Sequence, residues 1–279
     1  ENISADKTII AVGSVPARIP GWPEDPNLVC TSDEALHWNK LPEKLLIVGG
    51  GVIGCEFACM MHEYGVEVTV IEMLDGLLPE LEPELGAELE KIFKKRGMKI
   101  ITGAKVESLN ARSNGVTAEI STGQKLEVDK VLTAIGRRPA TEKIGLENIG
   151  IEAERGFVPV EKRMKTRARG CYCIGDANGR CLLAHAASAQ GIEAVMYALG
   201  QEHAHDLPVP YAVYTFPEVA SVGITTRQAA ERDIPVRIGN FPIGFLGKAM
   251  AVGQESGFVK VISHRETDKL LGVHMLGHN

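Results

Sequence analysis

The residues of this sequence with the clearest capacity for chemistry are glycines in a GxGxxG pattern. The pattern is formed by Gly49, Gly50, Gly51, Val52, Ile53 and Gly54. It follows a short apolar run and opens a segment of helical periodicity. In that setting Gly49 permits a tight turn, Gly51 lets a pyrophosphate approach bare backbone, and Gly54 lets the helix pack closely on the strand. The free N–H groups and the positive dipole end of the helix would hold the pyrophosphate. The pattern predicts a dinucleotide-binding βαβ unit over residues 44–72.

A glutamate at the end of this unit predicts which dinucleotide it binds. Glu72 lies 18 residues after Gly54, where a carboxylate can accept a hydrogen bond from the ribose 2′-hydroxyl of NAD. The 2′-phosphate of NADP would bring about two further negative charges, and no arginine offsets them among the next residues, Met73, Leu74 and Asp75. Taken alone, Glu72 could equally be a solvated residue at a strand end. Its spacing from the glycines favours NAD.

The elements that must position these residues follow an α/β pattern. Apolar runs predict strands flanking a helix over 52–64, at 45–48 and 68–72. A second helix is expected from Pro83 to Gly97, with its acidic residues at the start and its basic residues at the end. Short strands are expected next, at 98–102, 105–109, 116–121 and 131–135. The proline-rich residues 15–43 suit an irregular connection that ends in a short helix over 32–38.

Two further patterns lie outside this region. One combines strands at 8–12 and 171–174, the pair Gly175-Asp176 and a long helix over 182–199. The other follows a polar linker at 200–210 and has one helix, over 226–232, among several strands. Those strands are expected at 212–215, 219–222, 236–241, 257–262 and 270–276. The pattern of this last region predicts an α+β domain.

Composition narrows the classes of partner. The net charge of −6 supplies no cationic field for nucleic acid or anionic lipid, so neither is an expected partner. No apolar run approaches the roughly 18 residues of a membrane span, and we expect a cytoplasmic protein. The six cysteines form no CxxC pair, so we expect no metal site. Cys55 and Cys59 share a predicted helix face, where buried thiols act as apolar groups.

Several longer stretches of the sequence form a familiar set. They are KLLIVGGGVIGCEFA, VTVIE, VLTAIGRRPAT, YCIGDAN, LLAHAASAQG, VYTFPEVASVG, GFVKVI and LLGVHMLG. Together they resemble one enzyme family, the pyridine nucleotide-disulfide oxidoreductases. The resemblance covers essentially all 279 residues in order and is closest to the branch that oxidises dihydrolipoamide. It implies a Rossmann-like NAD-binding domain (21–136) inserted in a partial FAD-binding domain (1–20 and 137–206), followed by an α+β dimerisation domain (207–279).

The resemblance also implies an activity and partners. Electrons would pass between dihydrolipoamide and NAD through FAD and a redox disulfide. The expected partners are a second copy of the chain and the lipoyl-bearing acyltransferase of a 2-oxo acid dehydrogenase complex. Mercuric reductase and soluble transhydrogenase remain alternatives, whereas Glu72 disfavours the NADPH-preferring glutathione reductase. A further alternative is that these residues in isolation form a noncatalytic NAD-binding and dimerisation fragment.

Binding roles follow from the same resemblance. Val106 and Gly136 match positions that line the NAD site. The positions that match FAD contacts are Val12, Gly13, Ser14, Asp176, Leu182, Leu183, Ala184 and His185. Two positions depart from the family, since Val12 replaces a usual threonine and Ala186 a frequent lysine. Asp176 has an alternative role as a turn or helix cap.

The resemblance places the catalytic groups elsewhere. Glu56 matches a glutamate that pairs with a flavin-side lysine at a position before Glu1. Considered without the resemblance, Glu56 would be a negative charge near a helix N-terminus that complements the helix dipole. The redox cysteine pair would also precede Glu1, and the catalytic histidine with its glutamate would follow Asn279. No histidine present matches the catalytic one by motif, and four of them have no acidic partner at a suitable spacing: His203, His205, His274 and His278. We therefore expect no catalytic residue within these 279 residues.

Overall fold

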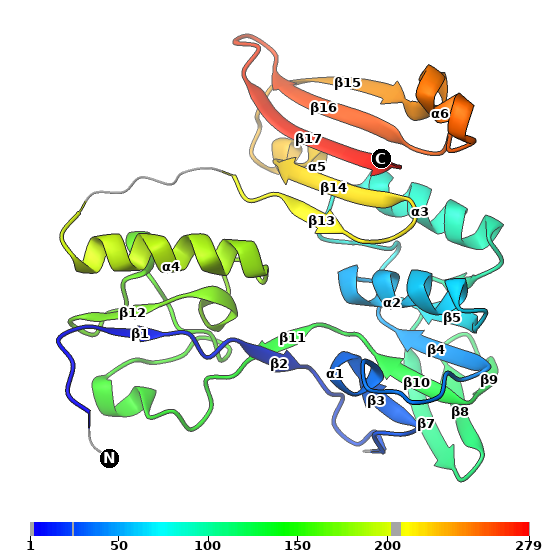
Figure 1. The fold of residues 1–279 in the computed structure, drawn as a ribbon, viewed down its shortest axis with the longest axis horizontal. Helices are drawn as coiled ribbons and strands as arrows, with labels where there is room; N and C mark the ends of the chain where they lie inside the picture. Colours follow the sequence, from blue (N-terminus) through cyan, green and yellow to red (C-terminus); the bar gives the residue numbers. More distant parts are fainter. Residues whose placement is uncertain (1–2, 24, 202–207, 279) are drawn as a thin grey trace. The chain divides into compact units, whose positions relative to one another are not determined.

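The computed structural model describes residues 3–23, 25–201 and 208–278. The chain divides into two units, which are described separately. The first comprises Glu1–Val15 and Arg137–Val209, and the second comprises Pro16–Gly136 and Pro210–Asn279. The chain thus leaves the first unit, builds part of the second, returns, and leaves again (Figure 1). This interrupted connectivity agrees with the expected insertion of one domain in another.

A five-stranded parallel sheet in the order β3-β10-β4-β5-β6 organises the second unit. Its strands are β3 (Val29–Thr31), β4 (Lys44–Val48), β5 (Glu67–Ile71), β6 (Lys99–Ile101) and β10 (Lys130–Thr133). Successive side chains of β4 enter opposite cores. Leu45 and Ile47 pack with the helices, whereas Leu46 and Val48 pack with a small antiparallel sheet. Burial on both faces explains why β4 is a continuous apolar run.

Helices cover one face of this sheet. They are α1 (Ser32–Ala35), α2 (Val52–Glu63) and α3 (Pro83–Lys95). In α3, Leu85, Leu89 and Phe93 recur every four residues and are fully buried. Proline in the first turn and lysines in the last favour its start and end as expected.

A three-stranded antiparallel sheet covers the other face. Its strands are β7 (Val106–Arg112), β8 (Gly115–Ile120) and β9 (Lys125–Val128). The expected irregular connection over 15–43 is wrong in part, because Val29–Thr31 pairs with β10 as the edge strand of the parallel sheet. Three residues among prolines carry too little pattern to reveal a strand whose partner lies 100 residues later.

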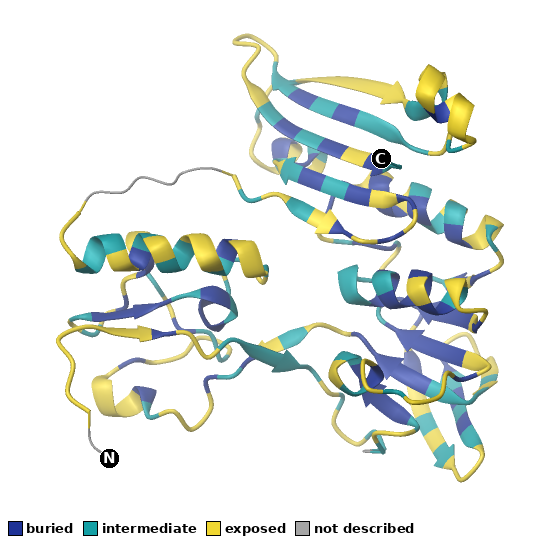
Figure 2. Cartoon of the chain, viewed as in Figure 1, coloured by how far each residue is buried: buried dark blue, intermediate teal, exposed yellow. Residues whose placement is uncertain are grey.

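The rest of the second unit is a five-stranded antiparallel sheet in the order β13-β14-β17-β16-β15. Its strands are β13 (Tyr211–Val213), β14 (Glu218–Gly223), β15 (Val236–Pro242), β16 (Phe258–His264) and β17 (Leu270–Gly277). It also contains α5 (Thr226–Glu231), α6 (Gly247–Val252) and the short helix η4 (Ile243–Phe245). Alternate residues of β14 and β17 are buried (Figure 2), as in a sheet with one packed face.

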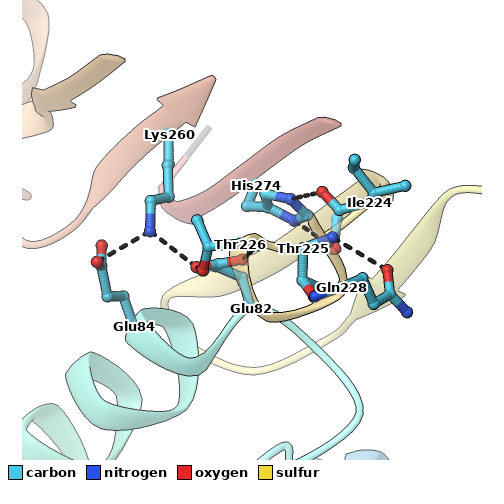
Figure 3. A network of polar contacts seen from close by, with 9 residues as sticks. Glu82, Glu84, Ile224, Thr225, Thr226, Gln228, Lys260 and His274 are labelled. Carbon is cyan, nitrogen blue, oxygen red and sulfur yellow. Dashed lines mark hydrogen bonds and ion pairs between the residues drawn. The ribbon is translucent and has the colours of Figure 1, made fainter. Parts of the chain in front are cut away.

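A buried ion pair joins this sheet to α3 (Figure 3). Lys260 on β16 is 3% exposed and lies 2.7 Å from a carboxylate oxygen of Glu82, which is 1% exposed. Glu82 precedes α3 and also accepts hydrogen bonds from the backbone N–H and hydroxyl of Thr226. Glu84, which is half exposed, lies 2.9 Å from the same ammonium. The antiparallel sheet and the start of α3 are therefore held together by ion pairs and hydrogen bonds.

The first unit is smaller. Parallel strands β1 (Thr8–Ile10) and β12 (Cys171–Cys173) form one sheet, and β2 (Ser14–Pro16) pairs with β11 (Arg137–Pro139). It also holds α4 (Ala184–Ala198) and three short helices, η1 (Leu146–Ile149), η2 (Lys162–Met164) and η3 (Gly175–Asn178). Residues 202–207 of the expected linker, and the boundary expected at 206/207, lie outside the described residues. Among the described helices of both units, none is long and apolar enough to cross a membrane.

Candidate functional site

The GxGxxG glycines form the turn between β4 and α2. Gly49 has a φ of +112°, and a Cβ there would lie 2.3 Å from the Ala134 carbonyl oxygen. A Cβ at Gly54 would lie 1.9 Å from the Gly49 carbonyl oxygen. Around Gly51, by contrast, no atom lies within 4 Å of the added Cβ. Two of the glycines therefore allow the protein to pack on itself, and the third faces open space at the helix N-terminus.

Glu72 lies beside this turn and is not a solvated strand-end residue. It is 8% exposed, and its Oε2 accepts a hydrogen bond of 2.6 Å from the Gly50 N–H. Its Oε1 accepts one of 2.8 Å from the Leu74 N–H. Each carboxylate oxygen can accept a further hydrogen bond, so the group can still accept one from a hydroxyl of a ligand.

The remaining NAD-side positions converge on the same edge of the sheet. Gly49, Glu72 and Gly136 each follow a strand of the parallel sheet at its carboxyl end, where ligands bind in open α/β folds. Gly136 has a φ of +110° and lies three residues after the end of β10 at Thr133. The Ala104 N–H donates to the Glu72 carbonyl, which fixes the turn that leads into Val106. Val106 itself is buried at the start of β7.

Glu56 faces a segment of the C-terminal sheet. Its Oε1 accepts a 2.9 Å hydrogen bond from the Tyr214 N–H, just after β13. Burial raises the pKa of Glu56 above its ordinary value, and this hydrogen bond offsets part of the effect. The contact with Tyr214 was not predictable from the sequence, because a backbone N–H donor carries no residue signature.

The FAD-side positions of the first unit meet at the η3 turn. Gly13 and Gly175 have positive φ angles of +68° and +65°. Ser14 Oγ donates a 2.5 Å hydrogen bond to Asp176 Oδ2, and Arg137 Nε donates to Ser14 Oγ over 2.7 Å. Arg137 was not among the expected site residues, although it lies in the GRRPAT motif. Asp176 is thus an acceptor in a side-chain cluster as well as a turn residue.

The segment that leads into α4 holds the other FAD-side positions. Leu183 is the N-cap of α4, and Ala184 is its first residue. Leu182 and His185 are exposed, and Val12 is 41% exposed. Ala186, which replaces a frequent lysine, is buried at 3% exposure.

Two histidines without a family match, His274 and His278, make structural contacts in the C-terminal sheet region. His274 is fully buried, and its Nε2 lies 2.9 Å from the Ile224 carbonyl oxygen. Because a carbonyl only accepts, Nε2 carries the proton, and Nδ1 accepts from Ser221 Oγ at 2.7 Å. His278 packs edge-on against Phe216, and burial followed by the charge of Arg96 lowers its pKa. His203 and His205 lie outside the described residues.

Comparison with known proteins identifies the family of this chain. Residues 1–191 match the model of pyridine nucleotide-disulphide oxidoreductases, and residues 209–279 match the dimerisation domain of the same enzymes. The chain belongs to the pyridine nucleotide-disulphide oxidoreductase family. The expected fold class, a Rossmann-like domain within an FAD-binding domain and a following dimerisation domain, is confirmed.

Individual relatives are consistent with this assignment. The chain is 43% identical to dihydrolipoyl dehydrogenase of Bacillus subtilis, over 97% of this chain and 59% of the relative. It is 40% identical to dihydrolipoyl dehydrogenase of Thermus scotoductus, over 99% of this chain and 61% of the relative. Among solved structures, LpdA from Mycobacterium tuberculosis matches with a TM-score of 0.90 and 31% identity, over 98% of this chain and 60% of that protein. The HOCl-induced flavoprotein disulfide reductase RclA from Escherichia coli matches with a TM-score of 0.89 and 30% identity, covering 99% and 65% respectively. The chain thus spans about three fifths of the length of these relatives.

Proposed function

We propose that the full-length protein is an FAD-containing, NAD-specific dihydrolipoyl dehydrogenase. The observation that carries the proposal is the buried Glu72 carboxylate beside the open face of the glycine turn, in a chain about 40% identical to enzymes of that name. FAD, when bound, would supply the redox chemistry that links a cysteine dithiol, formed when dihydrolipoamide reduces the redox disulfide, to NAD. The chain's own residues bind and orient the two nucleotides.

The NAD site in this proposal uses the carboxyl edge of the parallel sheet. Its residues are Gly49, Gly50, Gly51, Val52, Ile53, Gly54, Glu72, Val106 and Gly136. The pyrophosphate occupies the space in front of Gly51, where the structure has room, and receives hydrogen bonds from the first N–H groups of α2. Glu72 accepts a hydrogen bond from the adenosine ribose.

The FAD site uses the first unit. Its residues are Val12, Gly13, Ser14, Asp176, Leu182, Leu183, Ala184 and His185. The fit is supported by the open space around Gly13 and by Asp176 Oδ1, which has no hydrogen-bond partner among the described residues. Glu56 would pair with a flavin-side lysine supplied by another part of the full-length protein, and its raised pKa is consistent with a partly buried carboxyl that gains from such a cation.

Domain roles and partners complete the proposal. Residues 1–20 and 137–206 bind FAD, 21–136 bind NAD, and 207–279 form the dimer. Dimerisation is supported by the matched domain and by exposed apolar residues on β15 and η4, among them Ile238, Phe241 and Phe245. We further propose a cytoplasmic protein whose substrate is carried on the lipoyl-bearing acyltransferase of a 2-oxo acid dehydrogenase complex.

Turnover of the full-length protein tests this function. The purified protein should show flavin absorbance and reduce NAD with dihydrolipoamide, with no activity from the 279 residues alone. Turnover by the isolated chain would contradict the placement of the catalytic groups outside it. Activity with mercuric ion, or hydride transfer between NADH and NADP without dihydrolipoamide oxidation, would instead support the mercuric reductase or transhydrogenase alternatives.

One substitution made at two glycines should separate binding from folding. Gly51→Ser retains a favourable N-cap for α2 and meets open space, so its free energy of unfolding should stay within about 0.5 kcal/mol of wild type. Its side chain would occupy the pyrophosphate position and weaken NAD binding at least about tenfold. Gly54→Ser would clash with the Gly49 carbonyl and cost about 1–3 kcal/mol of stability. Thermal unfolding and NAD titration of both variants measure these effects, and unchanged NAD affinity in Gly51→Ser would contradict the site.

A further inference from the structure

Three side chains of the first unit are linked by hydrogen bonds whose donors and acceptors can be assigned from their chemistry. Asp176 Oδ2 and Ser14 Oγ lie 2.5 Å apart, and Arg137 Nε lies 2.7 Å from the same hydroxyl. Guanidinium nitrogens only donate, so Ser14 accepts from Arg137 and gives its single proton to Asp176. Arg137 Nη2 also donates to the Ser14 carbonyl oxygen over 2.8 Å. Arg137 therefore holds both the side chain and the backbone of Ser14.

These residues come from three separate elements that the fold brings together. Ser14 begins β2 and Arg137 begins β11, the paired strands at the points where the chain passes between its two units. The Ala140 N–H also donates to the Gly13 carbonyl, which fixes the backbone just before Ser14. The hydroxyl of Ser14 is thus held in place independently of Asp176.

The turn that carries Asp176 is fixed from its other side. Gln190 on α4 accepts hydrogen bonds of 2.8 Å from the Gly175 N–H and from the Asn178 side-chain amide. The Gly179 N–H closes the turn on the Asp176 carbonyl. With the backbone held by α4, the Asp176 side chain retains its own rotamer freedom, and Ser14 is the group that fixes one of its oxygens.

We propose that Ser14 and Arg137 are positioning residues that orient the Asp176 carboxylate for its contact with FAD. The inference rests on the proposed FAD-binding function. With Oδ2 held by Ser14, Oδ1 is directed to a single acceptor position, and FAD binds a carboxylate that is already ordered. Preorganisation of this kind raises affinity because the side-chain entropy is lost before the ligand arrives. Within the FAD site, the Ser14 hydroxyl thereby contributes to FAD binding through Asp176.

FAD affinity of the full-length protein tests the proposal. The flavin is removed, the apoprotein is titrated with FAD, and the dissociation constant is read from flavin fluorescence. Ser14→Ala and Arg137→Lys should each weaken FAD binding about tenfold, because a charge-assisted bond or the fork that supports it is lost. Ser14→Thr, which keeps the hydroxyl, should restore the wild-type constant. Arg138→Ala removes an exposed neighbour that pairs with Glu142 and should leave the constant unchanged.

A double substitution distinguishes a positioning role from a separate contact. If Ser14 acts through Asp176, Ser14→Ala should add nothing to the loss caused by Asp176→Asn. Full additivity, or wild-type affinity in both Ser14→Ala and Arg137→Lys, would overturn the proposal. Failure of the wild-type protein to bind FAD at all would overturn the proposed function itself. FAD binding by the wild-type protein is therefore measured before any variant is made.

Discussion

Replacing Lys260 with methionine is expected to lower the free energy of unfolding of the full-length protein by about 3–5 kcal/mol. Lys260 and Glu82 are both almost fully buried and lie 2.7 Å apart (Figure 3). Methionine matches the length of the lysine stem but leaves the Glu82 carboxylate buried without its cation. The hydrogen bonds from Thr226 remain but carry no full charge to replace the ammonium.

The pH dependence of this effect follows from the two pKa shifts. Burial alone would raise the pKa of Glu82, but the hydrogen bonds from Lys260 and Thr226 outweigh it and hold the pKa below 4.5. Burial alone would lower the pKa of Lys260, yet Glu82 and Glu84 hold it above 10.5. The stabilisation by Glu82 is therefore present above pH 4.5 and lost as pH falls through its lowered pKa. That by Lys260 is present below pH 10.5 and lost at higher pH.

Urea unfolding of wild type and variant between pH 3 and pH 8 measures the loss of stability in Lys260→Met and its dependence on the protonation of Glu82. Lys260→Met should differ most from wild type near neutral pH. The difference should shrink as the pH falls, because without Lys260 burial raises the pKa of Glu82 and the variant carboxyl is protonated before the wild-type one. Lys269→Met, at an exposed position between β16 and β17, should change stability by less than about 0.5 kcal/mol. The double variant Glu82→Gln with Lys260→Met should recover part of the loss. A difference between Lys260→Met and wild type that is the same at every pH would contradict the role of charge.

Replacing Glu72 with alanine should weaken NAD binding by about 10-fold to 100-fold, the value of a hydrogen bond to a charged acceptor. The same change should leave NADP affinity unchanged or raise it, because the 2′-phosphate no longer meets a carboxylate. Glu72→Arg should favour NADP further, since a guanidinium can pair with that phosphate. The loss of acceptors for the N–H groups of Gly50 and Leu74 adds to the effect on the glycine turn.

Equilibrium titration with NAD and NADP separates these contributions. Glu67 lies at the exposed first position of the same strand, so Glu67→Ala is a matched control that should bind both nucleotides as wild type does. Glu72→Gln keeps an acceptor for the turn but removes the charge. Compared with Glu72→Ala, it should restore the stability of the turn more fully than the discrimination between NAD and NADP. Unchanged discrimination in Glu72→Ala would remove Glu72 from the nucleotide site.

The βαβ unit was predictable from the sequence because each of its parts has a local signature. The glycines, the continuous apolar strand and the helix periodicity all occur within 30 residues, and the structure has β4, α2 and β5 there. The edge strand β3 was not predictable. Its three residues have no period of their own, and their strand identity comes from pairing with β10, which is distant in sequence.

Side-chain partners were harder to predict than elements. Lys260 would be taken as solvated from its residue type, and only the structure shows that it is buried beside Glu82 and Glu84 at the start of α3. Arg137 and Ser14 lie 123 residues apart, so their contact depends on the pairing of β2 with β11. Local patterns are therefore enough to propose the nucleotide sites, whereas long-range contacts decide how their side chains are held.

The binding preference of the full-length wild-type protein for NAD over NADP tests the central claim most directly. Isothermal titration of both nucleotides under the same conditions should give a dissociation constant for NAD at least about tenfold lower, because a single charge-assisted hydrogen bond separates the two ligands. Equal affinities, or tighter binding of NADP, would contradict the assignment of Glu72 and of the site built around it.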